Sequence, residues 1–478
     1  MRLKSFLFLI SLMILFTGTS FLLCIPYAIY YHEPLLPFYL PALIALISGF
    51  LFYTVSDKKY ETIKNNRERV VLIISLWLVL IMAGTMPYFI SKTIPSTVDV
   101  FFETISGMTA TGSSILTNPE GFPKSILFWR SLTHWIGGLA TIGILFIIMP
   151  SLNVGGYELF SVKENPARSF RFVAVRVFMI YCVLTLAQVL LLFTGGMNLF
   201  ESLCHSFGTV STGCFSPKND SIAGYSFYLQ YIMAFFMFLS GVSYVIYYLV
   251  ITGKWKEAAR VEESRIYLIV LVSVLALVAG MLYFKVEKEF TAAFRESVFQ
   301  VTSFVSSSGY SVTNYLKWPS HILPLLYLLL FIGGCSGSAS GGIKMSRFLV
   351  LLKNLRLQFK IPDLSLNQPP VKYNRINIDE NNNLSILTFI TVFGILFVVG
   401  TIFLSLCGTD LERSVFLAVS ALSTYGYNMG LSDFPNSGKM VLSFLMIAGR
   451  LEIYPLLLLF LPWLYKSAGN NPEDASER

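Results

Sequence analysis

Four short runs of hydroxyl-bearing and small residues end on a glycine, and each run lies beside a long apolar stretch. The glycines recur roughly every 100 residues, which is the spacing of a repeated structural unit rather than of a local motif. A backbone that turns its carbonyl oxygens inward to replace the hydration shell of an ion needs dihedral angles that glycine adopts without strain. The pattern therefore predicts one ion path lined by four parts of the chain. The runs are Thr109, Ala110, Thr111 and Gly112; Val210, Ser211, Thr212 and Gly213; Ser306, Ser307, Ser308 and Gly309; and Ser423, Thr424, Tyr425 and Gly426.

The residue before each glycine is expected to turn its backbone carbonyl toward the ion, and three of these four residues carry a short hydroxyl side chain. Glycine at all four positions leaves the ring free of side chains, which suits a large, weakly hydrated ion such as K+. The alternative is that these are small residues for helix packing in a membrane, but recurrence at near-equal spacing speaks against it. The predicted K+ ligands, through their backbone carbonyls, are Thr111, Thr212, Ser308 and Tyr425.

A second constellation, residues 333 to 344, places five glycines within twelve residues in the middle of an apolar stretch. Each glycine costs about 1 kcal/mol relative to alanine in a helix, so this helix must break at membrane depth. The break predicts a gate below the glycine runs. A phosphate-binding loop is the rival interpretation, but Ile343 follows the last glycine where that motif requires lysine, and no strand precedes it. The candidate gate residues here are Gly333, Gly334, Gly337, Gly341, Gly342 and Lys344.

Arg450 and Glu452 lie near the centre of the last apolar stretch. An uncompensated charge at that depth is costly, so such residues normally face a cavity and have partners. Arg450 is expected to stand beside the gate and raise the barrier for cations. The alternative is a static pair in which Arg450 and Glu452 fasten helices together. Since Glu452 is the only acidic residue expected deep in a span, movement of ions down their gradient is favoured over symport coupled to Na+ or H+.

Composition indicates an all-α polytopic membrane protein, since 55% of the residues are hydrophobic, 13% are charged and the mean hydropathy is +0.66. About ten spans are predicted. The apolar run at the start is longer than the core of a signal peptide, so we expect it to be the first of them. The predicted spans are 5–30, 36–55, 70–90, 125–150, 172–194, 226–251, 265–284, 322–356, 384–406 and 439–465.

The spans group into two N-terminal helices and four repeated units, each with an outer helix, a short descending segment, a glycine run and an inner helix. The descending segments have about ten to twelve residues, too few to cross a membrane, so they are expected to be re-entrant. The predicted boundaries are 1–69 for the N-terminal pair, then 70–171, 172–263, 264–383 with the gating loop, and 384–478.

Lysine and arginine are more frequent in the loops that share a side with both ends of the chain, which predicts cytoplasmic termini. This topology accounts for the net charge of +8 without nucleic-acid binding. The six cysteines have no C-x-x-C spacing, so no metal centre or cofactor is expected. A disulfide between Cys204 and Cys214, which flank the second run, remains an alternative to free thiols. No catalytic motif indicates an enzyme, and Trp129, His134 and Trp135 are interpreted as packing or interface residues.

The first two glycine runs, the glycine-rich stretch and residues 449–455 resemble the Trk/Ktr/HKT superfamily of K+ translocating subunits, closest to its TrkH/TrkG branch. The resemblance covers essentially the whole chain. It implies K+ uptake across the bacterial cytoplasmic membrane, with a selectivity filter at the glycine runs, an intramembrane gate, and Arg450 beside that gate. It also implies a homodimer bound to a cytosolic, nucleotide-sensing RCK subunit like TrkA. Tyr427 and Asn428 make the fourth run bulkier, which predicts a less symmetric filter and less strict K+ over Na+ selectivity.

Overall fold

The computed structural model describes residues 3–56, 66–143, 166–360, 370–374, 376–426, 431–453 and 455–456. These residues are mostly helical, with one short antiparallel hairpin in which Lys372 pairs with Asn377. The helices of the first half are α1 (Leu3–Leu22), α2 (Ile25–Tyr30), α3 (Leu36–Val55), α4 (Asn66–Ser91), α5 (Thr97–Met108), α6 (Lys124–Gly143), α7 (Pro166–Thr194), α8 (Leu199–Ser211), α9 (Phe227–Gly241) and α10 (Tyr244–Ile251). The later elements are α11 (Trp255–Ala258), α12 (Glu262–Val286), α13 (Phe290–Val305), α14 (Leu323–Ile332), α15 (Met345–Lys360), β1 (Lys372–Tyr373), β2 (Ile376–Asn377), α16 (Glu380–Leu406), α17 (Leu411–Leu422) and α18 (Asn436–Arg450).

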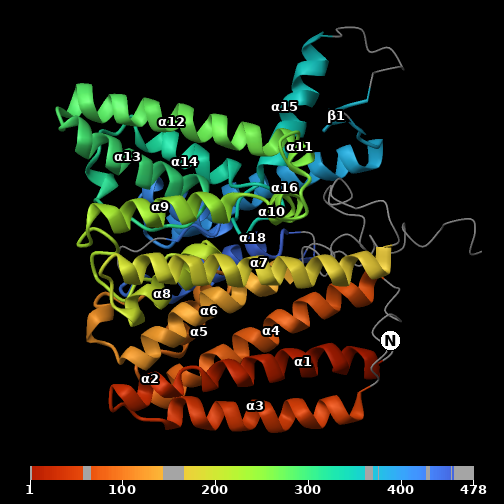
Figure 1. Cartoon of the computed structure of the whole chain (residues 1–478), viewed down its shortest axis with the longest axis vertical. Helices are drawn as coiled ribbons and strands as arrows, with labels where there is room; N and C mark the ends of the chain where they lie inside the picture. The colour runs from red at the N-terminus through yellow and green to blue at the C-terminus, as the bar shows by residue number, and fades with distance from the viewer. Residues whose placement is uncertain are drawn as a thin grey trace, which may run out of the picture.

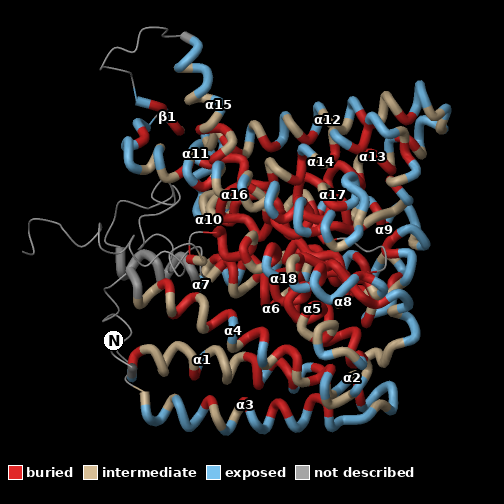
Figure 2. Tube along the Cα trace, turned by 180° about the vertical axis from the view of Figure 1, so that it is seen from behind, coloured by how far each residue is buried: buried red, intermediate tan, exposed pale blue. Residues whose placement is uncertain are grey.

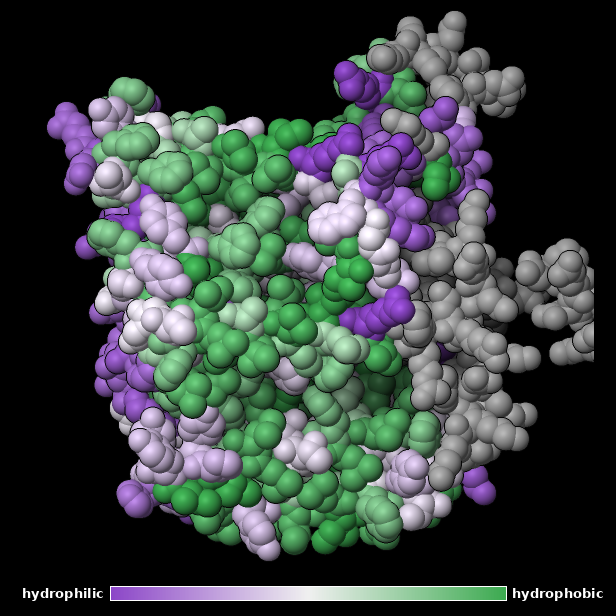
Figure 3. Space-filling model, viewed as in Figure 1, coloured by the Kyte–Doolittle hydropathy of each residue, from purple (hydrophilic) through white to green (hydrophobic). Residues whose placement is uncertain are grey.

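The chain is a multi-pass membrane protein. Within the described residues, six helices are long and apolar enough to cross a membrane, and the bent pair α9–α10 makes a seventh. The other three predicted spans coincide with α6, with the interrupted pair α14–α15 and with α18. The ends of the spans predicted at 125–150 and 439–465 lie outside the described residues. The long helices run side by side, and a broad apolar face lies between more polar ends (Figures 1 and 3).

The short descending segments are helices, and their contacts close a ring. Each one, α5, α8, α13 and α17, packs against the helix before it and the helix after it in the chain. Each also packs against the helix that follows the short helix of the preceding unit: α5 against α18, α8 against α6, α13 against α9 and α17 against α14. Because the last unit contacts the first, four units of one chain enclose a common centre, and buried residues concentrate there (Figure 2).

Helices α1 and α3 form an antiparallel pair at the edge of this ring (Figure 1). They pack closely through small residues, because a Cβ atom on Gly18 would lie 3.1 Å from the Cβ atom of Ala45. The pair is tied to the first unit at Glu33, whose carboxylate accepts hydrogen bonds from the backbone N–H groups of Lys124 (2.6 Å) and Ser125 (2.8 Å). These are orphan donors at the start of α6, so Glu33 serves as its cap.

Two of the predicted spans are each divided into two helices near the centre of the ring. The sixth predicted span, 226–251, is two helices that meet at an angle of 92°, with Val242 and Ser243 between them. The eighth is interrupted by residues 333–344, called the glycine-rich loop below, as its five glycines predict. The two breaks contact each other, because Cys335 N–H donates to the carbonyl of Gly241 (2.9 Å) and Tyr244 N–H donates to the carbonyl of Gly337 (3.0 Å).

Candidate functional site

Three of the four glycine runs share one backbone conformation. After the short helix ends, one residue is left-handed: Ala110 (φ 52°), Ser307 (φ 57°) or Thr424 (φ 49°). The N–H group of the next residue then donates to a carbonyl five residues back, as in Thr111 to Ser106 (3.0 Å). The glycine that follows is left-handed again, which is the conformation that favours glycine. These glycines are Gly112 (φ 84°), Gly309 (φ 76°) and Gly426 (φ 83°).

The second run follows the first two steps of this pattern one residue later than its glycine predicts, but its last residue, Cys214, does not have a positive φ. Its left-handed residue is Thr212 (φ 60°), and the hydrogen bond to a carbonyl five residues back comes from Gly213 N–H to Gly208 (2.8 Å). Gly213 therefore corresponds to Thr111, and Cys214 corresponds to Gly112. The expected equivalence of four glycines is wrong for this run, because α8 continues through Ser211 and shifts the register.

The four runs meet at one place. A Cβ atom placed on Gly309 would contact the carbonyl oxygen of Tyr425, and one on Gly426 would contact the carbonyl oxygen of Thr111. Cys214 closes the set, since its Sγ atom lies 3.3 Å from the carbonyl oxygen of Gly112. We refer to the equivalent residues as the central ring. They are Gly112, Cys214, Gly309 and Gly426.

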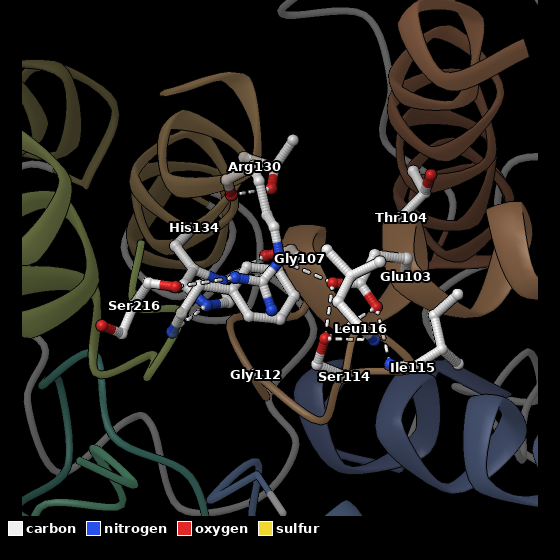
Figure 4. A network of polar contacts seen from close by, with 12 residues as sticks. Glu103, Thr104, Gly107, Gly112, Ser114, Ile115, Leu116, Arg130, His134 and Ser216 are labelled. Carbon is white, nitrogen blue, oxygen red and sulfur yellow. Dashed lines mark hydrogen bonds and ion pairs between the residues drawn. The ribbon is translucent and has the colours of Figure 1, made fainter. Parts of the chain in front are cut away.

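Behind the first run, Glu103 and Arg130 form a buried ion pair, with Nε 2.6 Å from Oε1 and with Glu103 fully buried (Figure 4). The Glu103 carboxylate also accepts hydrogen bonds from Ser114 Oγ (3.0 Å) and Ile115 N–H (3.0 Å), just after Gly112. A buried charge is tolerated when it is paired and fully hydrogen-bonded in this way. The pair therefore holds the backbone that follows Gly112.

Arg130 and His134 also hold the second run (Figure 4). Arg130 Nη1 donates to the carbonyl of Ser216 (3.2 Å), and its guanidinium lies 3.5 Å from the centre of the Phe215 ring. His134 stacks on the same Phe215 ring, with the two ring centres 4.1 Å apart. Its Nε2 accepts from Phe215 N–H (3.2 Å), so Nδ1 carries the proton donated to the carbonyl of Gly107 (2.8 Å). His134 thus connects two runs as well as packing between them.

A cavity of 330 Å³ lies against one side of the central ring. Gly309 and Gly426 form part of its wall, and polar groups such as Ser114 and Ser216 line it. Its charged lining residues within the described chain are Arg130, Lys218 and Asp220. The cavity therefore offers a polar approach to the ring.

The glycine-rich loop lies against the opposite side of the runs. Thr212 Oγ1 donates to the carbonyl of Ala339 (2.9 Å), and Arg450 Nη1 donates to the same oxygen (2.8 Å). A Cβ atom on Gly341 would contact the carbonyl of Ser423. The loop is thereby fastened to the second and fourth runs and to α18. Arg450 is 4% exposed, so its charge lies within the protein directly behind the loop.

Glu452 pairs with Arg347 rather than with Arg450. Glu452 Oε2 lies 2.5 Å from Arg347 Nη2, and the Arg347 guanidinium lies 3.9 Å from the centre of the Phe389 ring. The alternative of an Arg450–Glu452 pair is therefore wrong. Lys344 has a positive φ of 79° and donates to the carbonyl of Ser340, so it holds the last turn of the glycine-rich loop.

Glu263 is a buried carboxylate that sequence reasoning missed. Its Oε1 accepts from Ser336 N–H (2.5 Å) in the glycine-rich loop and from Ser346 N–H (2.9 Å) at the start of α15. Its Oε2 accepts from the hydroxyl of Tyr373 in β1 (3.3 Å). Burial is therefore not confined to Glu452: Glu103 in the short helix α5 and Glu263 at the start of α12 are also buried, although neither lies within a predicted span. Only its place at the start of an apolar helix could have drawn attention to Glu263.

None of the six cysteines, all of which lie in the described part of the chain, forms a disulfide, so no bridge joins Cys204 to Cys214. The structure brings together the four runs, the glycine-rich loop and Arg450, as their pattern predicts. Trp129 and Trp135 are held by hydrogen bonds to Gly84 (3.2 Å) and Thr185 (3.1 Å). Tyr427 and Asn428 lie outside the described residues.

The fold and the site define a class: a multi-pass membrane protein in which four short helices of one chain converge at a shared centre. The chain belongs to the TrkH family of cation transport proteins, whose family model matches residues 42–276 and 266–466. This membership confirms that the protein is a transporter rather than an enzyme.

Known relatives match along nearly the whole chain. The Trk system potassium uptake protein TrkH of Escherichia coli K12 is 29% identical over 95% of this chain and 97% of its own. TrkG of the same organism, also named a potassium uptake protein, is 28% identical over 92% and 94%. The crystal structure of the potassium transporter TrkH from Vibrio parahaemolyticus superposes with a TM-score of 0.88 at 25% identity, covering 96% of this chain and 98% of that one.

Proposed function

We propose that this protein takes up K+ across the bacterial cytoplasmic membrane through a gated, channel-like path. The central ring and the carbonyl groups beside it form the selectivity filter, and the glycine-rich loop forms the gate. The names of the relatives support K+ as the transported ion. The observation that carries the gate is the Ala339 carbonyl, which accepts hydrogen bonds from both Thr212 and Arg450.

The four short helices supply the electrostatics of this filter. Each ends at its run, so the partial negative charge of four helix C-termini is directed toward the same centre, which favours a cation. The hydroxyl groups of Ser307 and Thr424 are buried and make no hydrogen bond to the described residues. This fits side chains that face a hydrated path between the runs and the glycine-rich loop. A carbonyl ring followed by hydroxyl groups suits an ion that has lost part of its hydration shell.

The gate works through position and charge. Arg450 places a cation directly behind the glycine-rich loop, which raises the barrier for K+ as long as the loop stays in place. Conduction requires the Ala339 carbonyl to leave Thr212 and Arg450. Glu263 holds both ends of the loop, at Ser336 and Ser346, so movement of the loop is linked to the region around Tyr373.

We further infer that each subunit contains a complete path, because the contact of α18 with α5 closes the ring within one chain. We also propose the homodimer that the family resemblance implies. The start of α1, the end of α15 and strand β1 lie at the same end of the long helices (Figure 1). We assign this end to the cytoplasm, and a TrkA-like RCK subunit is expected to dock there and to act on the loop through α15.

Uptake of Rb+ into liposomes that hold the purified chain tests the transport mechanism. We expect uptake driven by membrane potential alone and inhibited by K+ more than by Na+. Glu103 and Glu452 support this mechanism over proton coupling, because they are held in ion pairs by Arg130 and Arg347, whereas Glu263 accepts hydrogen bonds from neutral groups. Uptake that requires a Na+ or proton gradient would instead identify a coupled symporter, and empty liposomes set the background.

A further inference from the structure

Cys214 occupies the position at which the other three runs have a left-handed glycine. We propose that Cys214 is a specificity-determining residue of the ion path, whose thiol weakens the preference of the filter for K+ over Na+. This inference rests on the proposed function. It concerns the register of the second run, which is set by the end of α8 at Ser211 and by the hydrogen bond from Gly213 N–H to Gly208.

The thiol lies among all four runs. Its Sγ atom donates to the carbonyl oxygen of Gly112 at 3.3 Å. It would lie 2.9 Å from a Cβ atom on Gly309 and 2.6 Å from one on Gly426. One side chain of the second run therefore reaches the first, third and fourth runs. Cys214 is fully buried, so this contact is made at the convergence of the runs and not at the surface.

Two physical effects follow from this position. A carbonyl oxygen that accepts a hydrogen bond from the thiol is a weaker ion ligand, so the ring offers K+ fewer oxygens of full strength. The thiol also adds volume where three glycines leave space, and this narrows the ring. A larger, weakly hydrated ion depends more on the number of carbonyl ligands than a smaller ion does, so both effects act against K+.

The alternative is that Cys214 is a packing residue, since buried free cysteines usually behave as small apolar side chains. The packing interpretation predicts that shortening the side chain lowers stability and leaves the ion preference unchanged. Cys204 provides the matched comparison, because it lies on α8, the helix that precedes Cys214, and is also fully buried, but belongs to the core behind the runs.

The test is Rb+ uptake into liposomes by full-length Cys214→Gly, with K+ and Na+ as competitors. We expect the ratio of the inhibitory concentrations of Na+ and K+ to rise by about tenfold, the lower end of what one added or missing group changes in a discriminating site. Cys204→Ala is expected to keep the ratio of the parent. An unchanged ratio in an active Cys214→Gly protein overturns the proposal.

Cys214→Ala and Cys214→Ser separate the two effects. Alanine removes the hydrogen bond to Gly112 and is expected to raise the same ratio of inhibitory concentrations by a smaller factor. This variant also tests the proposal if Cys214→Gly does not fold. Serine keeps a donor of similar size and is expected to leave the ratio close to that of the parent. If alanine leaves the ratio unchanged, the proposal is wrong. Failure of the parent itself to take up Rb+ would instead contradict the proposed function.

Discussion

At the scale of single residues, the glycines of the central ring are fixed by lack of space as well as by backbone conformation. A Cβ atom on Gly112 would contact the Sγ atom of Cys214 and lie 2.9 Å from its backbone nitrogen, and the φ of Gly112 is +84°. A left-handed conformation costs roughly 1–2 kcal/mol for other residues. The backbone contact cannot be relieved by rotating a side chain. Gly112 therefore sets the shape of the ring, which makes its substitution informative.

We expect Gly112→Ser to reduce the discrimination between K+ and Na+ in Rb+ uptake by about tenfold, because the added side chain displaces the carbonyl ligands of the ring. The control is Gly394→Ser in α16, where no atom lies within 4 Å of the added Cβ position. If the K+ and Na+ competition curves of Gly112→Ser are the same as those of the parent, Gly112 is not part of the selectivity filter.

At the scale of elements, two helix breaks that are hydrogen-bonded to each other form the region of the proposed gate. The break between α9 and α10 supplies a carbonyl and an N–H group that pair with the glycine-rich loop, while α18 delivers Arg450 from the other side. Each break exposes backbone groups that must find partners away from water. The glycine-rich loop supplies these partners for the interrupted helices. It is therefore held by a small set of hydrogen bonds, and the donor from Arg450 is a charged group.

We expect Arg450→Ala to raise basal Rb+ flux, because it removes a cation from the path and one of the two side-chain donors to Ala339. A hydrogen bond from a charged group contributes about 1.5–3 kcal/mol, so the increase in flux is expected to be about tenfold or more. Thermal unfolding of the purified protein checks that folding is retained. Arg260→Ala, at an exposed arginine between α11 and α12, is the control. Flux equal to that of the parent in a folded sample would assign Arg450 a structural role only.

At the scale of the whole molecule, a broad apolar face and two polar ends set the protein in a membrane (Figure 3). The direction in which it faces is a separate question, because the apolar surface is compatible with both orientations. The excess of lysine and arginine beside the ends of the chain predicts cytoplasmic termini. This orientation puts the end of α16, the start of α17 and the 330 Å³ cavity on the outside.

Cys407 reports this orientation, since it is a partly exposed free thiol at the end of α16, with its Sγ 3.4 Å from Ser437 Oγ. We expect a membrane-impermeant maleimide to label intact cells at Cys407, and Cys407→Ser to abolish the label. Cys182 lies in the middle of α7, at membrane depth, and the other four cysteines are buried. Labelling in inside-out vesicles but not in intact cells would reverse the orientation.

The sequence by itself determined the membrane class, the positions of the spans, the four descending helices and the break in the eighth span. Apolar length and glycine content act locally along the chain, so these features need no knowledge of neighbours in space. Only the tertiary structure decided that Cys214 enters the central ring and that Glu452 pairs with Arg347. It also decided that Glu103 holds the backbone after Gly112 and that Glu263 holds the glycine-rich loop. Each depends on where a helix ends and which helix packs against it, because hydrogen bonds and ion pairs form between segments that are distant in the chain.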